Sequence, residues 1–411
     1  MRAALVLRAR WVLPVAAAPI PGGWVAISGG RIVALGRRSP PAGAVDLGDA
    51  AILPGLVNAH THLEFSDTPA PLDASGGLPG WIGRVVAARR ARPTGQAGVA
   101  RLDAALRVGL AESLCHGVTT LGDIATEVPE GGYPQSAQRL RVFREALGLA
   151  SAGPLPPGRV CRDLDRLGDS AGLSPHASCT VSGPLGRALI HEAARRRIPA
   201  TMHLAESREE LEFACRGGGP FAELFARLGA WPAGRRPPVL PPSEWIRRLA
   251  RLPRASLVHG TFLGEEPDSG ALERLARHRR RVAAIVCPRT TRHLSATLPP
   301  VRRFLDAGVR VALGTDGRVS NPDLSVRAEA AELAGAGVVS AEEALSMMTV
   351  DAAWALGLER VAGRIATGRP ADLVVLDLRG RSGDPHEAIL RPETAVRAVV
   401  RRGRVLHGRL A

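Results

Sequence analysis

The sequence predicts an α/β fold in which a (β/α)8 TIM-like barrel carries a small β-sandwich built from both termini. Three observations predict it. Eight short apolar runs alternate with helical patterns between residue 51 and about residue 320, polar residues stand at the ends of most of these runs, and the two chain ends have a different composition. Of the 411 residues, 45% are hydrophobic, so the chain can bury a large core. A strand–helix alternation of this length is typical of a barrel that forms one domain.

The barrel is expected over residues 51–360. Its predicted strands are Ile52–Ala59, Gly117–Gly122, Leu140–Leu147, Ala171–Ser174, Pro199–Met202, Ala255–Val258, Val282–Val286 and Val309–Leu313. Amphipathic segments between them, such as Val99–Leu114, Leu185–Arg197 and Gly270–His278, predict the helices. The third run ends in Arg144-Glu145 and fits the pattern least well.

The two chain ends are expected to form the two halves of the sandwich, residues 1–50 and residues 361–411. Both are rich in Val, Ile, Gly and Arg with turn signals between short runs. Gly23–Ile27 and Arg31–Leu35 predict a hairpin, and Ala371–Asp377 and Ala395–Val400 predict strands of the second half.

The net charge is +15, and the chain contains no lysine, so all 54 basic residues are arginine. A basic chain can bind nucleic acid, but a general bias towards arginine explains the same charge. The arginines are spread over many segments and only 3% of residues are aromatic, which leaves little for base stacking. We therefore expect a small-molecule substrate and no nucleic-acid partner.

The apolar runs are far shorter than the ~18 residues that a membrane span needs, so no membrane contact is expected. The five cysteines are widely spaced without a Cys-x-x-Cys pair, which favours a reducing, cytoplasmic location over a disulfide framework. The sequence leaves a homodimer open.

Four side chains at run ends have the composition of a metal site. His60 and His62 are two residues apart on an expected strand, so their rings face the same way. His203 and Asp316 follow later runs and complete three nitrogens and one oxygen. Two packed histidines and a helix-capping Asp316 are the alternatives. This donor set favours one divalent metal ion, with zinc preferred and iron also suited.

Two further side chains supply groups that move or hold protons. Glu206 stands three residues after His203, beside the expected metal but not as a ligand, where it can carry a proton from water to substrate. His259 can hydrogen-bond the water or the leaving group. The alternatives are an exposed glutamate at a helix start and a structural histidine. With Asp316, these residues are the expected catalytic groups.

The motifs Pro54–His62, His203–Glu206, His259 and Gly314–Asp316 resemble the amidohydrolase superfamily, in its branch of mononuclear deaminases and chlorohydrolases. The resemblance covers essentially the whole chain. The segments His60–Ser66, Trp81-Ile82 and His203–Ser207 look most like aminodeoxyfutalosine deaminase-type proteins, and they are also similar to S-adenosylhomocysteine and methylthioadenosine deaminases. Many relatives bridge two metals with a carboxylated lysine, which the absence of lysine excludes here.

The resemblance implies a metal-dependent hydrolase of carbon–nitrogen bonds that removes ammonia from an aminated purine nucleoside, with aminodeoxyfutalosine, of a menaquinone route, as the leading candidate. It also implies that His176 contacts the purine ring, that Glu64 contacts ribose hydroxyls, and that Trp81 binds substrate. Hydrolysis of a chloro-triazine or a cyclic amide is the alternative reaction, and a non-catalytic binding barrel is disfavoured by the complete ligand set. After Cys287-Pro288-Arg289 the family pattern expects Ser or Thr and then His, whereas this chain has Thr290-Thr291-Arg292 and His293.

Overall fold

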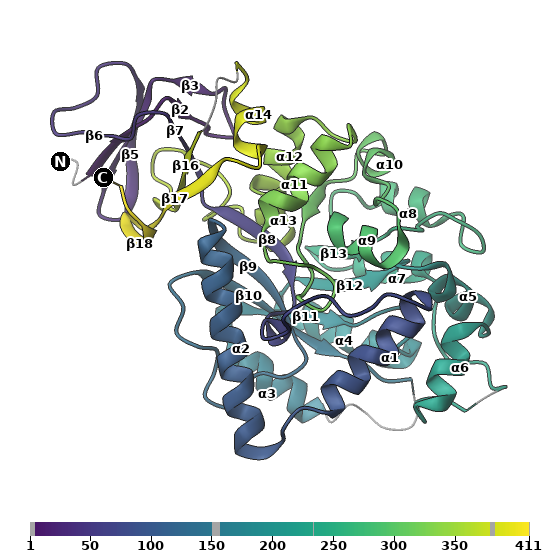
Figure 1. The fold of residues 1–411 in the computed structure, drawn as a ribbon. Helices are drawn as coiled ribbons and strands as arrows, with labels where there is room; N and C mark the ends of the chain where they lie inside the picture. The colour runs from purple at the N-terminus through teal and green to yellow at the C-terminus, as the bar shows by residue number, and fades with distance from the viewer. Residues whose placement is uncertain (1–4, 150–156, 233, 379–382, 411) are drawn as a thin grey trace.

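The computed structural model describes residues 5–149, 157–232, 234–378 and 383–410. These ranges form a barrel with a separate pair of sheets at one side, and strands from both the first and the last part of the chain lie in that pair of sheets (Figure 1). The predicted fold class is therefore confirmed. No helix within the described ranges is long and apolar enough to cross a membrane.

The barrel is a sheet of eight parallel strands that follow one another in chain order. The strands are β8 (Leu56–Thr61), β9 (Val118–Ala125), β10 (Arg139–Ala146), β11 (Ala171–Pro175), β12 (Ala200–Leu204), β13 (Ala255–His259), β14 (Val282–Val286) and β15 (Val311–Leu313). The amide of Thr315 donates to the carbonyl of His60 at 2.9 Å and the amide of His62 to the carbonyl of Asp316 at 3.2 Å. These bonds connect the first strand to the segment after the last one, so the two ends of the predicted metal motif meet.

Helices surround this sheet. They are α1 (Gly77–Arg90), α2 (Gly95–Cys115), α3 (Pro157–Leu167), α4 (Gly183–Arg196), α5 (Arg208–Arg216), α6 (Pro220–Arg227), α7 (Pro242–Leu249), α8 (Ala271–Arg277), α9 (Pro288–Ser295), α10 (Val301–Asp306), α11 (Val326–Gly335), α12 (Ala341–Met347), α13 (Val350–Ala355) and α14 (Pro385–Leu390), with short 3-10 turns at Leu63–Phe65 and Gly168–Ser170. Helix α13 shares one apolar cluster with strand residues such as Val57, Phe143 and Ile285. The barrel interior is thus packed with side chains there, as in other barrels.

The predicted strand Ile52–Ala59 is divided in the structure. Strand β7 (Ala50–Pro54) belongs to the terminal sheets, and β8 begins the barrel directly after Gly55. A Cβ atom at Gly55 would lie 2.2 Å from Oγ1 of Thr119, so only glycine fits this crossing point. Both strands are fully buried, which is why the apolar pattern shows no break between them.

The terminal sheets form a sandwich from both ends of the chain. One sheet has the order β5-β4-β1-β6 and the other β18-β17-β16-β7-β2-β3. The strands are β1 (Leu5–Arg8), β2 (Trp11–Val12), β3 (Ile20–Pro21), β4 (Gly23–Ser28), β5 (Arg31–Arg37), β6 (Val45–Asp46), β7, β16 (Leu373–Asp377), β17 (Ala395–Arg401) and β18 (Arg404–Gly408). Their buried side chains form one cluster that includes Leu7, Ile52 and Val375.

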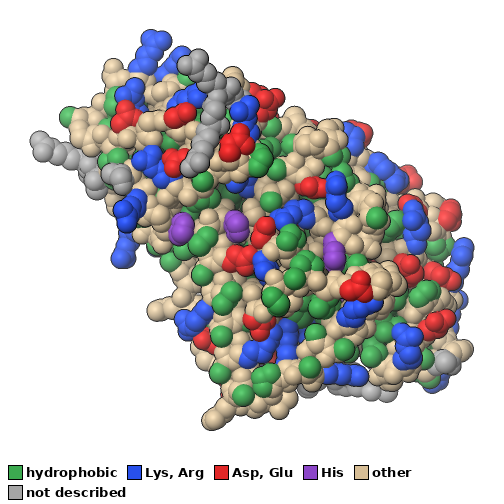
Figure 2. All heavy atoms as spheres, viewed as in Figure 1, with side chains coloured by type: hydrophobic (Ala, Val, Ile, Leu, Met, Phe, Trp, Pro, Cys, Tyr) green, Lys and Arg blue, Asp and Glu red, His purple; other side chains and the backbone are tan. Residues whose placement is uncertain are grey.

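Basic and acidic side chains are interspersed on the face of the molecule shown in Figure 2. Many arginines pair with carboxylates. For example, Arg195 and Arg196 both contact Glu192 at 2.5–2.6 Å. This arrangement is compatible with the expectation that no nucleic acid binds, which stays a prediction.

Candidate active site

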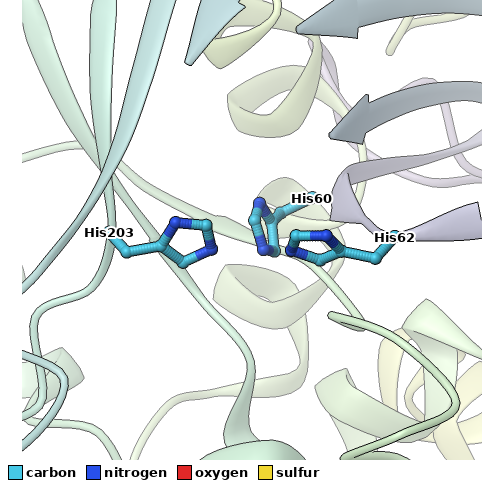
Figure 3. A group of neighbouring side chains, drawn as sticks. All are labelled: His60, His62 and His203. Atoms are coloured by element: carbon cyan, nitrogen blue, oxygen red, sulfur yellow. The ribbon is translucent and has the colours of Figure 1, made fainter. Parts of the chain in front are cut away.

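The residues predicted to bind metal come together at the carboxyl ends of the barrel strands. His60 lies in β8, His203 in β12 and His259 at the end of β13, while His62 and Asp316 follow β8 and β15. The rings of His60, His62 and His203 face one another (Figure 3), with centroids 4.9–5.6 Å apart. Ligand atoms of these three residues lie within 4.8 Å of one another, and the same holds for the group of His60, His259 and Asp316.

The backbone turns sharply at the ends of three of these strands. Ala205, His259 and Asp316 have φ values of +53°, +66° and +55°, which non-glycine residues rarely adopt and which often mark functional sites. Neither of the glycines beside Asp316, Gly314 and Gly317, has a positive φ. A Cβ at Gly314 would lie 2.7 Å from Cβ of His60, so Gly314 permits close packing while Asp316 itself takes the left-handed conformation.

His62 and His203 are held in a neutral form that can bind metal. Nδ1 of His203 lies 3.0 Å from the carbonyl of His176, so it donates there and leaves Nε2 with its lone pair. Burial lowers the pKa of His62 to about 4 and that of His203 well below its ordinary value. Burial alone would raise the pKa of Asp316, but His60, His62 and His259 lower it far more, so the carboxylate is charged.

The donor set fits a divalent metal ion. Neither ring nitrogen of His60 has a hydrogen-bond partner among the described residues, and Nδ1 of buried His62 has none. Oδ1 of Asp316 lies 3.4 Å from Nε2 of His60 and 3.5 Å from Nε2 of His62. Buried nitrogens without partners around one carboxylate are costly unless a cation completes the site, and this mixture of nitrogen and oxygen suits zinc.

Glu206 lies beside this cluster as a buried acid. Burial, followed by the charges of Asp316 and Glu210, raises the pKa of Glu206 well above its ordinary value. Glu210 fixes the position of Glu206 because its Oε2 accepts the backbone amide of Glu206 at 2.7 Å, and its other oxygen accepts from Ser178. Glu206 can therefore hold a proton at neutral pH.

His259 stands between the acid and the metal cluster. Its Nε2 lies 3.4 Å from Oε1 of Glu206, and its ring is 5.4 Å from that of His203. Burial lowers the pKa of His259 to about 3, so the ring is neutral. A neutral imidazole here can accept or donate one hydrogen bond to a reacting oxygen.

A cavity of about 300 Å³ opens onto these groups. Its wall includes His62, His203, Glu206, His259 and Asp316, together with two of the predicted substrate residues, His176 and Trp81. Trp81 belongs to α1, and its Nε1–H donates to the carbonyl of Val319 at 3.1 Å, so its ring is fixed in the wall. We call this the barrel-mouth cavity; its volume is at the lower end of the range for small-molecule sites.

Glu64 is not one of the residues that line this cavity. Its carboxylate lies 2.5 Å from Nη2 of Arg89 and 3.1 Å from Nη1 of Arg92. The structure therefore places Glu64 behind Arg89. The predicted ribose contact of Glu64 stays a prediction, and nothing in this position favours it.

Arg89 and Glu145 line the cavity and were not identified as site residues from the sequence. Glu145 is fully buried near the end of β10, and burial would raise its pKa, but His176, His62 and Arg89 outweigh burial and lower it. The sequence does mark Glu145, because Arg144 and Glu145 are charged residues at the end of an apolar run. Nε of Arg144 donates to Oδ2 of Asp163 at 2.7 Å, so Arg144 is paired within the protein. Arg89 lies on helix α1, and the pattern of apolar runs predicts site residues only at the ends of the strands.

The segment after β14, where the sequence departs from the family pattern, supports the site from behind. Oγ1 of Thr290 lies 3.1 Å from Oγ of Ser320, which donates to Oδ2 of Asp316 at 2.6 Å. Nε2 of the displaced His293 bonds the carbonyl of Leu72 at 2.8 Å, and His293 is not among the cavity-lining residues.

A barrel with a three-histidine, one-carboxylate cluster and an acid beside it defines the class of barrel hydrolases that need a metal ion. The amidohydrolase family model matches residues 51–406, and the chain belongs to the amidohydrolase family. The resemblance found in the sequence is thereby confirmed, and the protein is a hydrolase that acts on carbon–nitrogen bonds.

Two curated relatives share most of the chain. An aminodeoxyfutalosine deaminase of Deinococcus radiodurans is 34% identical over 332 residues, covering 75% of this chain and 75% of that protein. A 5-methylthioadenosine/S-adenosylhomocysteine deaminase of Natronomonas pharaonis is 29% identical over 388 residues, covering 90% and 83%.

Two solved structures share the fold. Helicobacter pylori aminofutalosine deaminase in complex with methylthio-coformycin has a TM-score of 0.85 at 23% identity, covering 98% of this chain and 100% of that one. An adenosine deaminase from Xanthomonas campestris with bound zinc has a TM-score of 0.74 at 26% identity, covering 98% and 93%.

Proposed function

We propose that this amidohydrolase is a hydrolytic deaminase of an adenosine-like nucleoside, with aminodeoxyfutalosine as the leading candidate substrate. The reaction replaces the exocyclic amino group of the ring by oxygen from water and releases ammonia. The names of the two curated relatives support the reaction class, and the higher identity to the Deinococcus protein supports the particular substrate. This substrate would give the enzyme a role in a menaquinone route, in the cytoplasm.

The observation that carries the proposal is the position of Glu206. The ring carbon that bears an amino group is a poor electrophile for water until a neighbouring ring nitrogen is protonated. Glu206 is a buried carboxyl whose raised pKa keeps a proton at neutral pH, and it lines the cavity beside the metal cluster. Hydrolysis at a ring carbon that already bears chlorine has less need of such an acid, so Glu206 favours deamination.

We assign one divalent metal ion, zinc in preference to iron, to His60, His62, His203 and Asp316. When bound, the ion supplies a Lewis acid that lowers the pKa of a water molecule to about 7. Glu206 gives its proton to the ring nitrogen, which makes the adjacent carbon electrophilic. His259, 3.4 Å from Glu206, holds the oxygen that develops negative charge at that carbon. The oxygen of the water molecule adds to that carbon, and one of its protons moves to Glu206. Glu206 passes this proton to the amino group, the carbon–nitrogen bond breaks and ammonia leaves. The remaining proton on the added oxygen returns to Glu206, which restores the acid and leaves a carbonyl on the ring.

The cavity wall away from the metal supports a nucleoside that carries an apolar extension. Leu78, Trp81 and Ile82 of α1 and Phe225 of α6 line it. An aromatic or thioether group on the 5′ carbon of the sugar can pack against this wall. A purine base without extension would leave these side chains without contact.

Ammonia release from a panel of substrates tests the proposal. The panel contains aminodeoxyfutalosine, 5′-methylthioadenosine, S-adenosylhomocysteine and adenosine, with a chloro-triazine and a cyclic amide as the alternative substrates. We expect release from at least one nucleoside and the highest kcat/KM with aminodeoxyfutalosine. Turnover of the triazine or the cyclic amide with no release from any nucleoside would overturn the proposal.

A further inference from the structure

One polar part of the cavity wall has hydrogen-bonding groups that the protein itself does not use. Glu145 is almost completely buried and lines the cavity. Its Oε2 accepts from Oγ1 of Thr126 at 3.0 Å, but its Oε1 has no hydrogen-bond partner among the described residues. A buried carboxylate oxygen without a donor is costly, so this atom is expected to gain a donor from a ligand.

Arg89, which lies next to Glu145, offers hydrogen-bond donors where Glu145 offers acceptors. Nη2 of Arg89 donates to Glu64 and to Oγ1 of Thr126, the same hydroxyl that contacts Glu145. Its Nε–H is buried and has no acceptor among the described residues. Thr126 thus contacts both a guanidinium and a carboxylate, and each of these groups has a buried atom, Nε of Arg89 and Oε1 of Glu145, that has no partner among the described residues.

His176 adds a second donor. The amide of Ala177 donates to Oγ1 of Thr180 at 3.2 Å, and that hydroxyl lies 2.6 Å from Nδ1 of His176. The hydroxyl also lies 3.3 Å from the carbonyl of Ala177, but its contact with the ring is much shorter. We therefore assign the hydroxyl proton to the bond with Nδ1, which places the ring proton on Nε2. That Nε2 lies 3.8 Å from Oε1 of Glu145, too far for a direct hydrogen bond. A ligand atom beside this pair can form hydrogen bonds with both of them.

The charges of this group limit what it can bind. A carboxylate or phosphate would be repelled by Glu145, and an ammonium group would be repelled by Arg89. A neutral hydroxyl satisfies both residues, because it donates one hydrogen bond and accepts another. In a purine nucleoside, N3 of the ring and the 2′-hydroxyl lie on the same edge, so a ring nitrogen at His176 places a hydroxyl close to Glu145.

We propose that Glu145 accepts a hydrogen bond from the 2′-hydroxyl of the nucleoside, with Arg89 donating to the same sugar edge, and that this contact makes the enzyme selective for ribonucleosides. The inference rests on the proposed nucleoside deamination. Glu64, expected from the resemblance to contact the ribose, has a different part: it holds Arg89 through the ion pair at its back.

The test compares ammonia release from 5′-methylthioadenosine and from its 2′-deoxy analogue. For the wild type we expect kcat/KM to favour the ribose form by roughly 10- to 100-fold, the scale of a hydrogen bond to a charged group. Glu145→Ala should bring this ratio close to one, and the isosteric Glu145→Gln should lower it to a few-fold. Bound metal and melting temperature are measured for each variant, and if Glu145→Ala does not fold, the wild type and Glu145→Gln decide the outcome.

Glu64→Gln is the matched control, a neighbouring carboxylate in the same polar cluster. It is expected to lower both rates through Arg89 and to reduce the ratio by much less than Glu145→Ala does. Equal kcat/KM for the two nucleosides in the wild type, an unchanged ratio in both Glu145 variants, or loss of the ratio only in Glu64→Gln would overturn the inference while leaving deamination intact. Release of ammonia from no nucleoside would instead overturn the proposed function itself.

Discussion

The two ends of the barrel-mouth cavity are built in different ways. At the metal end, His60, His203 and His259 lie on barrel strands, and their ring positions are fixed by backbone pairing across the sheet. At the opposite end, the wall comes from α1, α6 and the loops between strands and helices. The comparison suggests that the strand ends set the reaction, whereas helices and loops outside the sheet set which molecule reaches it.

Removal of metal ligands should produce the largest loss of activity. The structural change should be confined to the metal end of the cavity. The wild type is expected to bind one metal ion per chain, and the double variant His60→Ala His62→Ala should retain almost none and lose activity completely. Elemental analysis after gel filtration measures both. A stoichiometry near two in the wild type, or tight metal in the double variant, would contradict a mononuclear site.

Replacement of the acid separates chemistry from metal binding at that same end. Glu206→Gln keeps the shape of the side chain and should keep the metal, but it should lower kcat by roughly 10²- to 10⁴-fold, the usual scale for a general acid–base group. Steady-state kinetics with metal analysis of the same sample checks this. Near-normal turnover would mean that another group moves the proton.

His176 lies between the two ends, so its variant should affect both binding and reaction. His176→Ala should raise KM and lower kcat together, reducing kcat/KM by roughly 10- to 100-fold, because a buried polar group of the substrate loses its partner at ~1–3 kcal/mol. A change in KM alone would place His176 with the far wall rather than with the reacting ring.

At the far end we expect a smaller effect that depends on the substrate. Trp81→Leu should leave the metal content unchanged and lower kcat/KM by about 3- to 10-fold for nucleosides with an apolar 5′ extension, in proportion to the apolar area lost. Adenosine, which lacks the extension, is the matched control substrate and should change less. An equal loss for both substrates would mean that Trp81 does not contact the extension.

The smallest expected effect is on the melting temperature of the protein and comes from Glu329, a buried carboxyl near the metal end of the cavity. Burial raises the pKa of Glu329 from 4.5 to about 7, although the amide of Arg289 and Asn321 donate to it. Because the folded state binds this proton more tightly than the unfolded state, the favourable contribution is full below about pH 4.5 and is lost as the pH rises through 7. Relative to Glu329→Gln, the wild-type Tm should therefore fall by roughly 2–4 °C between pH 5 and pH 8. Thermal unfolding of both proteins across this range measures the difference, and a constant offset would contradict it.

The metal end could be predicted from the sequence because its signals are local. His60 and His62 follow the two-residue period of a strand, and the remaining ligands stand at run ends that a parallel barrel brings together. The division of the first predicted strand at Gly55 could not be predicted, because both halves are buried and the cause is a contact with Thr119, far along the chain.

Trp81, which the resemblance implies, does line the far wall, but the charged residues Arg89 and Glu145 of the cavity could not be predicted. Arg89 lies on a helix whose orientation depends on tertiary packing, and no period in the sequence marks which of its arginines reaches the cavity. A carboxylate at the end of an apolar run, such as Glu145, can mark a site residue, but the same charge also makes the run less typical of a barrel strand. The ribose contact of Glu64, which the resemblance implies, stays a prediction, and in the structure its carboxylate pairs with Arg89 and Arg92.

The crossing at Gly55 has a consequence for the synthesis of the chain. Strand β7 pairs with β16, so residues 50–54 obtain this partner only after residues 373–377 have been made. Nearly the whole polypeptide must therefore leave the ribosome before β7 can pair with β16. Strand β7 leads directly into β8, the strand that carries His60. A chain that stops before residue 373 would expose the edge of β7 to other chains, and such truncated products should aggregate rather than accumulate as free barrels.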